Sequence, residues 1–160
     1  MRKTRIIEYP KYKKVLFCTD FSQNADYAFG FAYGIVKRDE GLLYILHVIP
    51  ENPQEAFLEM LIPRDTVNKL HTIIKEDVEN NYKDHYVKTI GNKITYKIVT
   101  KSGREDNEIL KFAKKENVDI IVIGTHGITG IEHVFFGSVA EKVLRRSPIP
   151  VFIIPSMKRA

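Results

Sequence analysis

The sequence contains a single cysteine and no long apolar run. Cys18 cannot form an internal disulfide, and it stands in the apolar run from Val15 to Cys18, where a buried thiol behaves as a small hydrophobic side chain. No stretch approaches the roughly 18 apolar residues of a membrane-spanning helix, and the N-terminus lacks the apolar core of a signal peptide. We therefore expect a cytoplasmic protein of a reducing compartment, without a membrane partner.

Common catalytic signatures are also missing. The chain has no G-x-S-x-G nucleophile elbow, no Walker Gly-Lys-Ser/Thr sequence and no G-x-G-x-x-G after its first predicted strand. The chain therefore lacks the residues with which these hydrolases, P-loop motors and dehydrogenases carry out their reactions. The five histidines show no recurring metal-ligand spacing, and no cysteine or acidic cluster supplements them. We predict no catalytic residues and no metal site built from protein ligands alone.

The charge excess lies at one end of the chain. Residues 1–14 hold six Lys or Arg against one Glu and so supply the whole net charge of +5, because residues 15–160 hold 19 charges of each sign. A nucleic-acid-binding fold normally spreads positive charge over a groove or a helix face. We interpret residues 1–11 as a solvated basic arm, in preference to a nucleic-acid arm, and residues 12–156 as one domain large enough to bury its own core.

Five short apolar runs rich in Val, Ile and aromatic residues are typical of strands. They are Lys14 to Cys18, Leu42 to Val48, Ile94 to Val99, Asp119 to Ile123 and Pro150 to Ile154. Segments with helical periodicity lie between them, and parallel strands need such helical crossovers. The alternation predicts an α/β fold: a single-domain, doubly wound five-stranded parallel sheet with helices on both faces. It does not fix the strand order, for which we expect the common open arrangement 3-2-1-4-5.

The long connection between the second and third predicted strands contains two apolar segments. One helical face, which we expect to point inward, is shared by Val67, Leu70, Ile74 and Val78. The segment from Pro50 to Pro63 is also apolar, although its prolines mark a connection. We expect it to form a loop or short helix folded against the rim of the sheet, with a partner-binding flap as the alternative.

A glycine-spaced segment follows the fourth predicted strand. Nine residues separate Gly124-Thr125-His126-Gly127 from Gly137-Ser138, which opens a helix. In the expected strand order this segment lies where the chain reverses direction, and ligands bind there beyond the carboxyl ends of the strands. Glycines let the backbone approach an anion, and the first amides of a helix favour phosphate. Ser138 and Glu141 also have capping-box spacing, so a plain N-cap at Ser138 stays open as the alternative.

The same glycine spacing, G-x2-G-x9-G-S/T, resembles the ATP-binding signature of the universal stress protein family. The residues from Ser138 to Leu144 and the run Ser147-Pro148-Ile149-Pro150-Val151 are similar to the last helix and strand of that family. Val15 to Asp20 and Val118 to Gly124 resemble it as well, so the similarity covers most of residues 12–155.

The resemblance implies an ATP-binding stress or regulatory protein that acts as a homodimer. It places Thr19, Asp20 and the backbone of Val48 beside adenine and ribose, and the glycine loop and following helix beside the phosphates. The full set of nucleotide-binding residues that we expect is Thr19, Asp20, Val48, Ile123, Gly124, Thr125, Gly127, Gly137, Ser138 and Val139.

One segment departs from the family pattern. Many members carry basic residues between the second and third glycines, where this chain has Ile128 to His133. AMP and ADP therefore stay open beside ATP, and Mg²⁺ can arrive with the nucleotide, with Ser138 or Asp20 as its protein ligands. A nucleotide-free dimer and interaction module of the same fold is the alternative function. Slow ATP hydrolysis is the most catalysis that we expect.

The last predicted strand, Val151 to Ile154, lies at a sheet edge in the expected order. An exposed apolar edge is a pairing hazard unless it is covered. The edge position and the family resemblance both indicate a homodimer through this strand. We also expect the dimer to bind other proteins, which the sequence does not identify.

Overall fold

The computed structural model describes residues 9–125 and 137–156. They form one five-stranded sheet in the order β3-β2-β1-β4-β5, with every neighbouring pair parallel. The strands are β1 (Lys14–Thr19), β2 (Leu42–Pro50), β3 (Thr95–Gly103), β4 (Ile120–Gly124) and β5 (Val151–Ile154). This confirms the predicted fold class and strand order, although β3 extends four residues beyond the predicted end at Val99.

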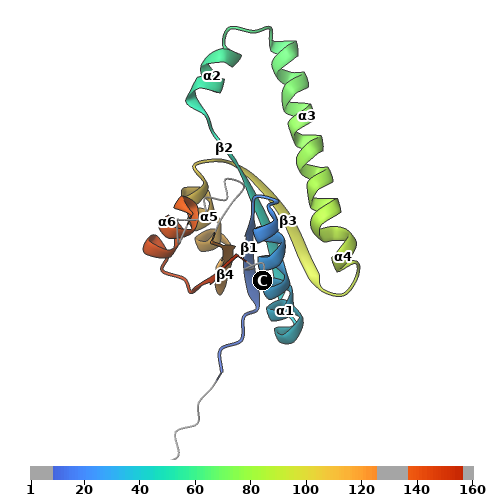
Figure 1. Cartoon of the computed structure of the whole chain (residues 1–160), viewed down its shortest axis with the longest axis vertical. Helices are drawn as coiled ribbons and strands as arrows, with labels where there is room; N and C mark the ends of the chain where they lie inside the picture. Colours follow the sequence, from blue (N-terminus) through green and yellow to red (C-terminus); the bar gives the residue numbers. More distant parts are fainter. Residues whose placement is uncertain (1–8, 126–136, 157–160) are drawn as a thin grey trace, which may run out of the picture.

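Helices cover both faces of the sheet (Figure 1). One face carries α1 (Gln23–Asp39) and the lower end of α3 (Arg64–Tyr82), followed by a π-helical turn η1 (Lys83–Val87) and the short α4 (Lys88–Ile90). The other face carries α5 (Glu105–Glu116) and α6 (Ser138–Arg146). A further helix, α2 (Pro53–Glu59), follows β2 and lies away from the sheet.

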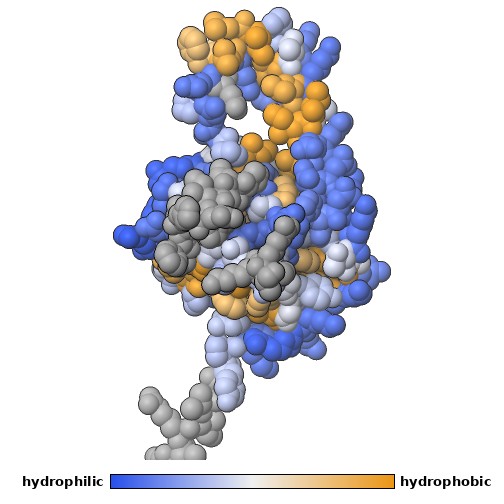
Figure 2. Space-filling model, viewed as in Figure 1, coloured by the Kyte–Doolittle hydropathy of each residue, from blue (hydrophilic) through white to orange (hydrophobic). Residues whose placement is uncertain are grey.

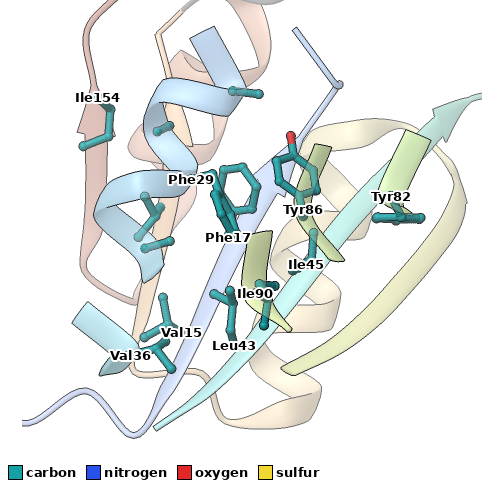
Figure 3. Close-up of a cluster of buried hydrophobic side chains, with 14 of the residues drawn as sticks. Val15, Phe17, Phe29, Val36, Leu43, Ile45, Tyr82, Tyr86, Ile90 and Ile154 are labelled. Atoms are coloured by element: carbon teal, nitrogen blue, oxygen red, sulfur yellow. The ribbon is translucent and has the colours of Figure 1, made fainter. Parts of the chain in front are cut away.

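The alternation of side chains along β1 divides the core into two layers. Val15 and Phe17 point to the layer under α1, whereas Leu16 and Cys18 point to the layer under α5 and α6, because successive strand residues face opposite sides. Figure 3 shows the first layer, in which Phe17 meets the rings of Phe29 and Tyr86 at centroid distances of 5.6 and 5.4 Å. The central strands are therefore apolar on both faces, as parallel strands require.

Two local features set the length of α1. Its N-cap Ser22 accepts a hydrogen bond from the amide of Ala25 at 3.2 Å, and its C-cap Glu40 adopts the left-handed conformation with φ of 50°. Gly41 then passes under the chain leading into β1, where an added Cβ would lie 2.8 Å from the carbonyl oxygen of Lys13. The sharp turn delivers the chain directly into β2.

The predicted inward face of α3 packs on the core only at its lower end. Val78 is buried, whereas Leu70 and Ile74 are exposed and Val67 is partly exposed, so the expectation was wrong for the upper half of the helix. The sheet is covered on this side by the last turns of α3 and by η1 and α4, whose Val78, Tyr82, Tyr86 and Ile90 are the buried residues of this connection. The upper half of α3 therefore extends beyond the sheet (Figure 1).

The segment from Pro50 to Pro63 contains the short helix α2, which begins at the N-cap Asn52. Its apolar side chains do not fold against the sheet rim, because Phe57, Leu58, Met60 and Leu61 are all exposed. The short helix is one of the two forms expected here, and the expectation that the segment packs on the rim was wrong. We call residues 52–74, which comprise α2 and the upper half of α3, the α2–α3 arm.

Candidate functional site

A cavity of about 450 Å³ opens at the carboxyl ends of β1 and β4, where the chain reverses direction across the sheet. A volume between about 300 and 1,000 Å³ is typical of a small-molecule site. The cavity is lined by Cys18, Thr19, Asp20, Ala25, Leu46, His47, Val48, Pro50, Glu105, Ile109, Ile123, Gly124, Thr125, Gly137, Ser138, Val139 and Ala140.

The cavity lies where the described helices that follow β1 and β4 cover opposite faces of the sheet. Cys18 and Ile123 are paired across the two strands. Beyond this pair, β1 leads to α1 on one face, whereas α6, the next helix in the described part of the chain, lies on the other. Neighbouring strands whose connections diverge in this way leave a crevice between them.

The described residues of the predicted site come together here. Thr19, Asp20, Val48, Ile123, Gly124, Thr125, Gly137, Ser138 and Val139 all line the cavity. Gly127 lies outside the described residues. Sequence patterns did not single out Ala25, Leu46, Pro50 or Ile109, because apolar residues at the end of a buried strand or helix carry no motif.

A tight turn after β1 holds Thr19 and Asp20. The hydroxyl of Thr19 accepts the amide of Phe21 at 2.9 Å, and Asp20 Oδ1 accepts the amide of Ser22 at 3.1 Å. Phe21 adopts a φ of 62°, a conformation that non-glycine residues rarely occupy. Asp20 therefore stabilises this turn and also lines the cavity.

Two buried tyrosines connect the cavity wall to the helices of the first face. Tyr86, in the π-helical turn, shares a 2.5 Å hydrogen bond with the hydroxyl of Thr19, and the Tyr82 hydroxyl accepts the amide of His47 at 3.0 Å. His47 Nδ1 lies 2.9 Å from the Thr19 carbonyl oxygen. Burial raises the pKa of both tyrosines, so they act as neutral hydroxyls. The base of α3 thereby fixes the position of β1 and β2 at the cavity.

Gly124 ends β4 against the side chain of Asn24, which would have to move to admit a Cβ. A Cβ there would lie 2.6 Å from Asn24 Nδ2. The next residue, Thr125, donates its amide to Ile154 at 2.9 Å and accepts the amide of Gly137 at 2.5 Å. These bonds bring the two ends of the glycine-spaced segment together, so that Gly124 and Gly137 line the same cavity.

Three helices reach the cavity with their N-terminal residues: α1 through Ala25, α5 through Glu105 and α6 through Ser138. They differ in how their first amides and their dipoles are compensated. The N-cap of α6 is Gly137, with no side chain to accept the first amides, so the alternative of an N-cap at Ser138 was wrong. By contrast, α1 is capped by Ser22, and α5 carries three acidic residues in its first turn. The positive end of the α6 dipole therefore faces the cavity with the least local compensation.

A charged cluster that the sequence did not reveal joins α5 to α6 beside the cavity. Asp106 is only 2% exposed, and its carboxylate accepts bonds from Arg104 at 2.8 and 3.0 Å and from Arg146. Arg146 also donates to Asn107 Oδ1 at 2.9 Å. The hydrogen bond from Arg104 holds the pKa of Asp106 below its ordinary value, so the carboxylate stays charged.

Chemistry beyond non-covalent binding finds little support in the residues described. Burial raises the pKa of the Cys18 thiol, which makes it a poor nucleophile although it lines the cavity. In residues 9–125 and 137–156, no group of three or more His, Cys, Asp or Glu side chains could hold a metal ion. No helix in those ranges combines the length and apolar character that crossing a membrane requires.

Comparison with known proteins gives consistent matches over nearly the whole chain. The model of the universal stress protein family matches residues 11–155. Universal stress protein MJ0577 of Methanocaldococcus jannaschii is 34% identical over 159 residues, covering 89% of this chain and 94% of that protein. Universal stress protein MJ0531 of the same organism is 31% identical over 150 residues, covering 92% and 85%.

Solved structures agree with these matches. The structure of hypothetical protein MJ0577 has a TM-score of 0.74 at 32% identity, covering 94% of this chain and 100% of that chain. A universal stress protein from Archaeoglobus fulgidus in complex with dAMP has a TM-score of 0.54 at 19% identity, covering 91% and 99%. The second likeness is one of fold.

Proposed function

Because the chain belongs to the universal stress protein family, we propose that it is a cytoplasmic regulatory protein that binds an adenine nucleotide in the cavity between β1 and β4. One observation carries the proposal: the uncapped N-terminus of α6 and an apolar pocket of nucleotide size share one cavity. Phosphate and purine need these two environments side by side.

The lining residues suggest how each part of the ligand lies. Leu46, Val48 and Ile123 offer apolar surface for a purine ring. Asp20 can accept hydrogen bonds from ribose hydroxyls, and the amides at Ser138 and Val139 can donate to phosphate oxygens. Any Mg²⁺ would arrive with the nucleotide and find Asp20 or the Ser138 hydroxyl as protein ligands. The dAMP complex of a more distant protein of this fold supports the ligand class.

The first turn of α6 has no lysine or arginine to bind a phosphate, and charged side chains of the helix are paired with one another or with Asp106. Glu141, the acidic residue of that turn, is paired with Arg145 at 3.0 Å, so its charge is partly compensated. Arg146 at the other end of the helix is engaged by Asp106. The first-turn amides are then the main attraction for an anion, which favours modest affinity over very tight binding.

We also propose that the protein forms a homodimer through β5. Both edges of the sheet expose backbone, but β3 carries Lys97 and Lys101, and lysine on an edge strand discourages pairing. β5 has no charge, and its Phe152 is half-exposed and packs edge-to-face on Phe31 of α1 at 5.9 Å. The uncharged edge, extended by aromatic surface, is the one suited to pairing with a second copy.

The decisive experiment measures ligand content and affinity together. Mass spectrometry of small molecules released from the purified protein should detect AMP, ADP or ATP, and calorimetric titration should give binding to the stripped protein. Asp20→Asn should bind more weakly yet fold normally, because the amide oxygen can still accept from Ser22. Glu79→Gln, a change of the same charge on an exposed site of α3, is the matched control.

The outcomes separate the two functions under consideration. Retained or titratable adenine nucleotide that depends on Asp20 supports the proposal. A protein that carries no nucleotide and binds none would instead be a structural dimer and interaction module of the same fold. Phosphate release above background in the presence of Mg²⁺ would add slow ATP hydrolysis to the binding function.

A further inference from the structure

The α2–α3 arm exposes most of the large apolar side chains on the surface. Of thirteen large hydrophobic residues that are exposed in the described chain, eight belong to the arm. They are Phe57, Leu58, Met60, Leu61, Ile62, Leu70, Ile73 and Ile74, and we call them the arm patch. Figure 2 shows this apolar surface over α2 and the upper part of α3, beyond the more polar body of the protein.

The arm patch is built on regular secondary structure. α2 has a side-chain N-cap, since Asn52 Oδ1 accepts the amide of Gln54 at 3.0 Å, and turns at Met60 and Leu61 lead toward α3. Glu59 of α2 and His71 of α3 are joined by a 2.9 Å contact between side-chain atoms. The two helices thus hold the patch in a defined shape, which a docking surface requires.

The area of the patch is that of a protein interface. The exposed fractions of its eight residues correspond to about 900 Å² of accessible surface, taking roughly 200 Å² for a large apolar residue. The largest apolar patch on a typical monomer is about 300–600 Å². A stable complex of standard size buries about 800 Å² on each partner. The patch therefore exceeds ordinary exposure and matches one half of an interface.

The charges along α3 favour a second copy of the chain as the occupant. Its first seven residues carry one net positive charge, from Arg64, Asp65 and Lys69, whereas residues 75–79 carry two net negative charges. Two such helices packed antiparallel about a two-fold axis would place the basic end of each beside the acidic end of the other. A two-fold interface needs this kind of self-complementary surface.

We propose that the α2–α3 arm is a second self-association surface, on which the arm of another copy docks antiparallel. Leu70, Ile73 and Ile74 would lie near the two-fold axis, with the apolar residues of α2 closing over them. This interface lies on a different element from the β5 edge. A chain with two separate two-fold interfaces forms tetramers or longer assemblies, depending on how the axes meet.

The test isolates the arm from the edge strand. The starting variant is Phe152→Lys, in which a charge on β5 prevents pairing through the edge strand. Sedimentation or light scattering measures the molecular mass of this variant in solution over a range of concentrations. Adding Ile73→Glu places a charge in the patch and should weaken the remaining self-association roughly tenfold or more. Asn68→Glu is the matched control, since it adds the same charge to an exposed residue about 140° around the same helix.

Circular dichroism and thermal melts verify that each variant is folded, and Phe57→Ser provides a second disruption from α2. Concentration-dependent dimers of Phe152→Lys that persist with Asn68→Glu and are lost with Ile73→Glu support the proposal. A Phe152→Lys protein that stays monomeric at every concentration overturns it. So does equal association of the two glutamate variants, or an arm that binds lipid vesicles while the protein remains monomeric. Nucleotide titration of the same variants is independent of these outcomes.

Discussion

Replacement of Ser138 by aspartate separates the stability of α6 from its proposed role in binding phosphate. Ser138 is the first residue of α6, it is exposed, and it follows an N-cap that has no side chain. A carboxylate at this position interacts favourably with the positive end of the helix dipole. The same carboxylate would occupy the region where we place the phosphates. Ser138→Asp should therefore stabilise the protein and weaken nucleotide binding.

The two effects have different sizes. The dipole interaction contributes about 0.3–1 kcal/mol, which corresponds to a rise in melting temperature of about 1–3 °C for a domain of this length. Two unit charges about 5 Å apart repel by about 3 kcal/mol at an effective dielectric constant near 20. Because Ser138 is exposed, water and salt reduce this repulsion by half or more. We therefore expect about a tenfold loss of affinity.

Thermal melts and calorimetric titration with ATP, ADP and AMP measure the two effects on the same samples. The loss should grow with the number of phosphates and diminish at high salt, whereas Ser138→Asn, which has similar size and no charge, should bind nearly as well as the parent. Unchanged affinity in Ser138→Asp, with the expected rise in stability, would show that the phosphates do not lie at the N-terminus of α6.

Three further changes probe the supports of the cavity. Gly124→Ala should destabilise the fold by about 1 kcal/mol, because the Asn24 side chain, whose Nδ2 lies 2.6 Å from the new Cβ, must shift; an unchanged denaturant midpoint would contradict the geometry. Tyr86→Phe should lower the free energy of unfolding by about 1 kcal/mol through loss of the hydrogen bond to Thr19. Denaturant unfolding should show this as a lower midpoint with an unchanged m-value. The folded pKa of Asp106 lies below its ordinary 3.8, so its stabilisation is present above that pH and disappears as pH falls through the folded value. Asp106→Asn should therefore destabilise the protein by about 1–2 kcal/mol at neutral pH and by progressively less as the pH falls below 3.8. A loss that does not change with pH would refute the assignment.

The sheet could be predicted because its signal is local. The central strands β1, β2 and β4 are short apolar runs buried on both faces, so their side chains alone mark them. The helical crossovers between the strands leave parallel pairing as the consistent solution. The position of the site followed from the same information, since a reversal of strand order opens a crevice wherever it occurs. Thr19, Asp20 and Gly124 could be identified in advance because they end strands at that crevice.

The helical connection after β2 could not be predicted in the same way. Its apolar periodicity at Leu70 and Ile74 is that of a packed helix, but periodicity does not say whether a sheet lies beneath a given turn. No local sequence pattern marks the π-helical turn that positions Tyr86 for its hydrogen bond to Thr19. The same is true of the ion cluster around Asp106.

By itself the sequence determined which segments form strands and that a glycine-spaced segment between the fourth strand and a helix could bind an anion. The point of reversal followed only from the arrangement common to such sheets. These are properties of residues close together in the chain, where burial and backbone freedom follow from residue type. Only the tertiary structure decided that Gly137 and not Ser138 caps α6, that Tyr86 fastens β1, and that the arm extends past the sheet. The last two depend on contacts between segments far apart in sequence, which packing sets and local patterns do not encode. The cap is a choice between two adjacent residues, which the capping-box spacing by itself leaves open.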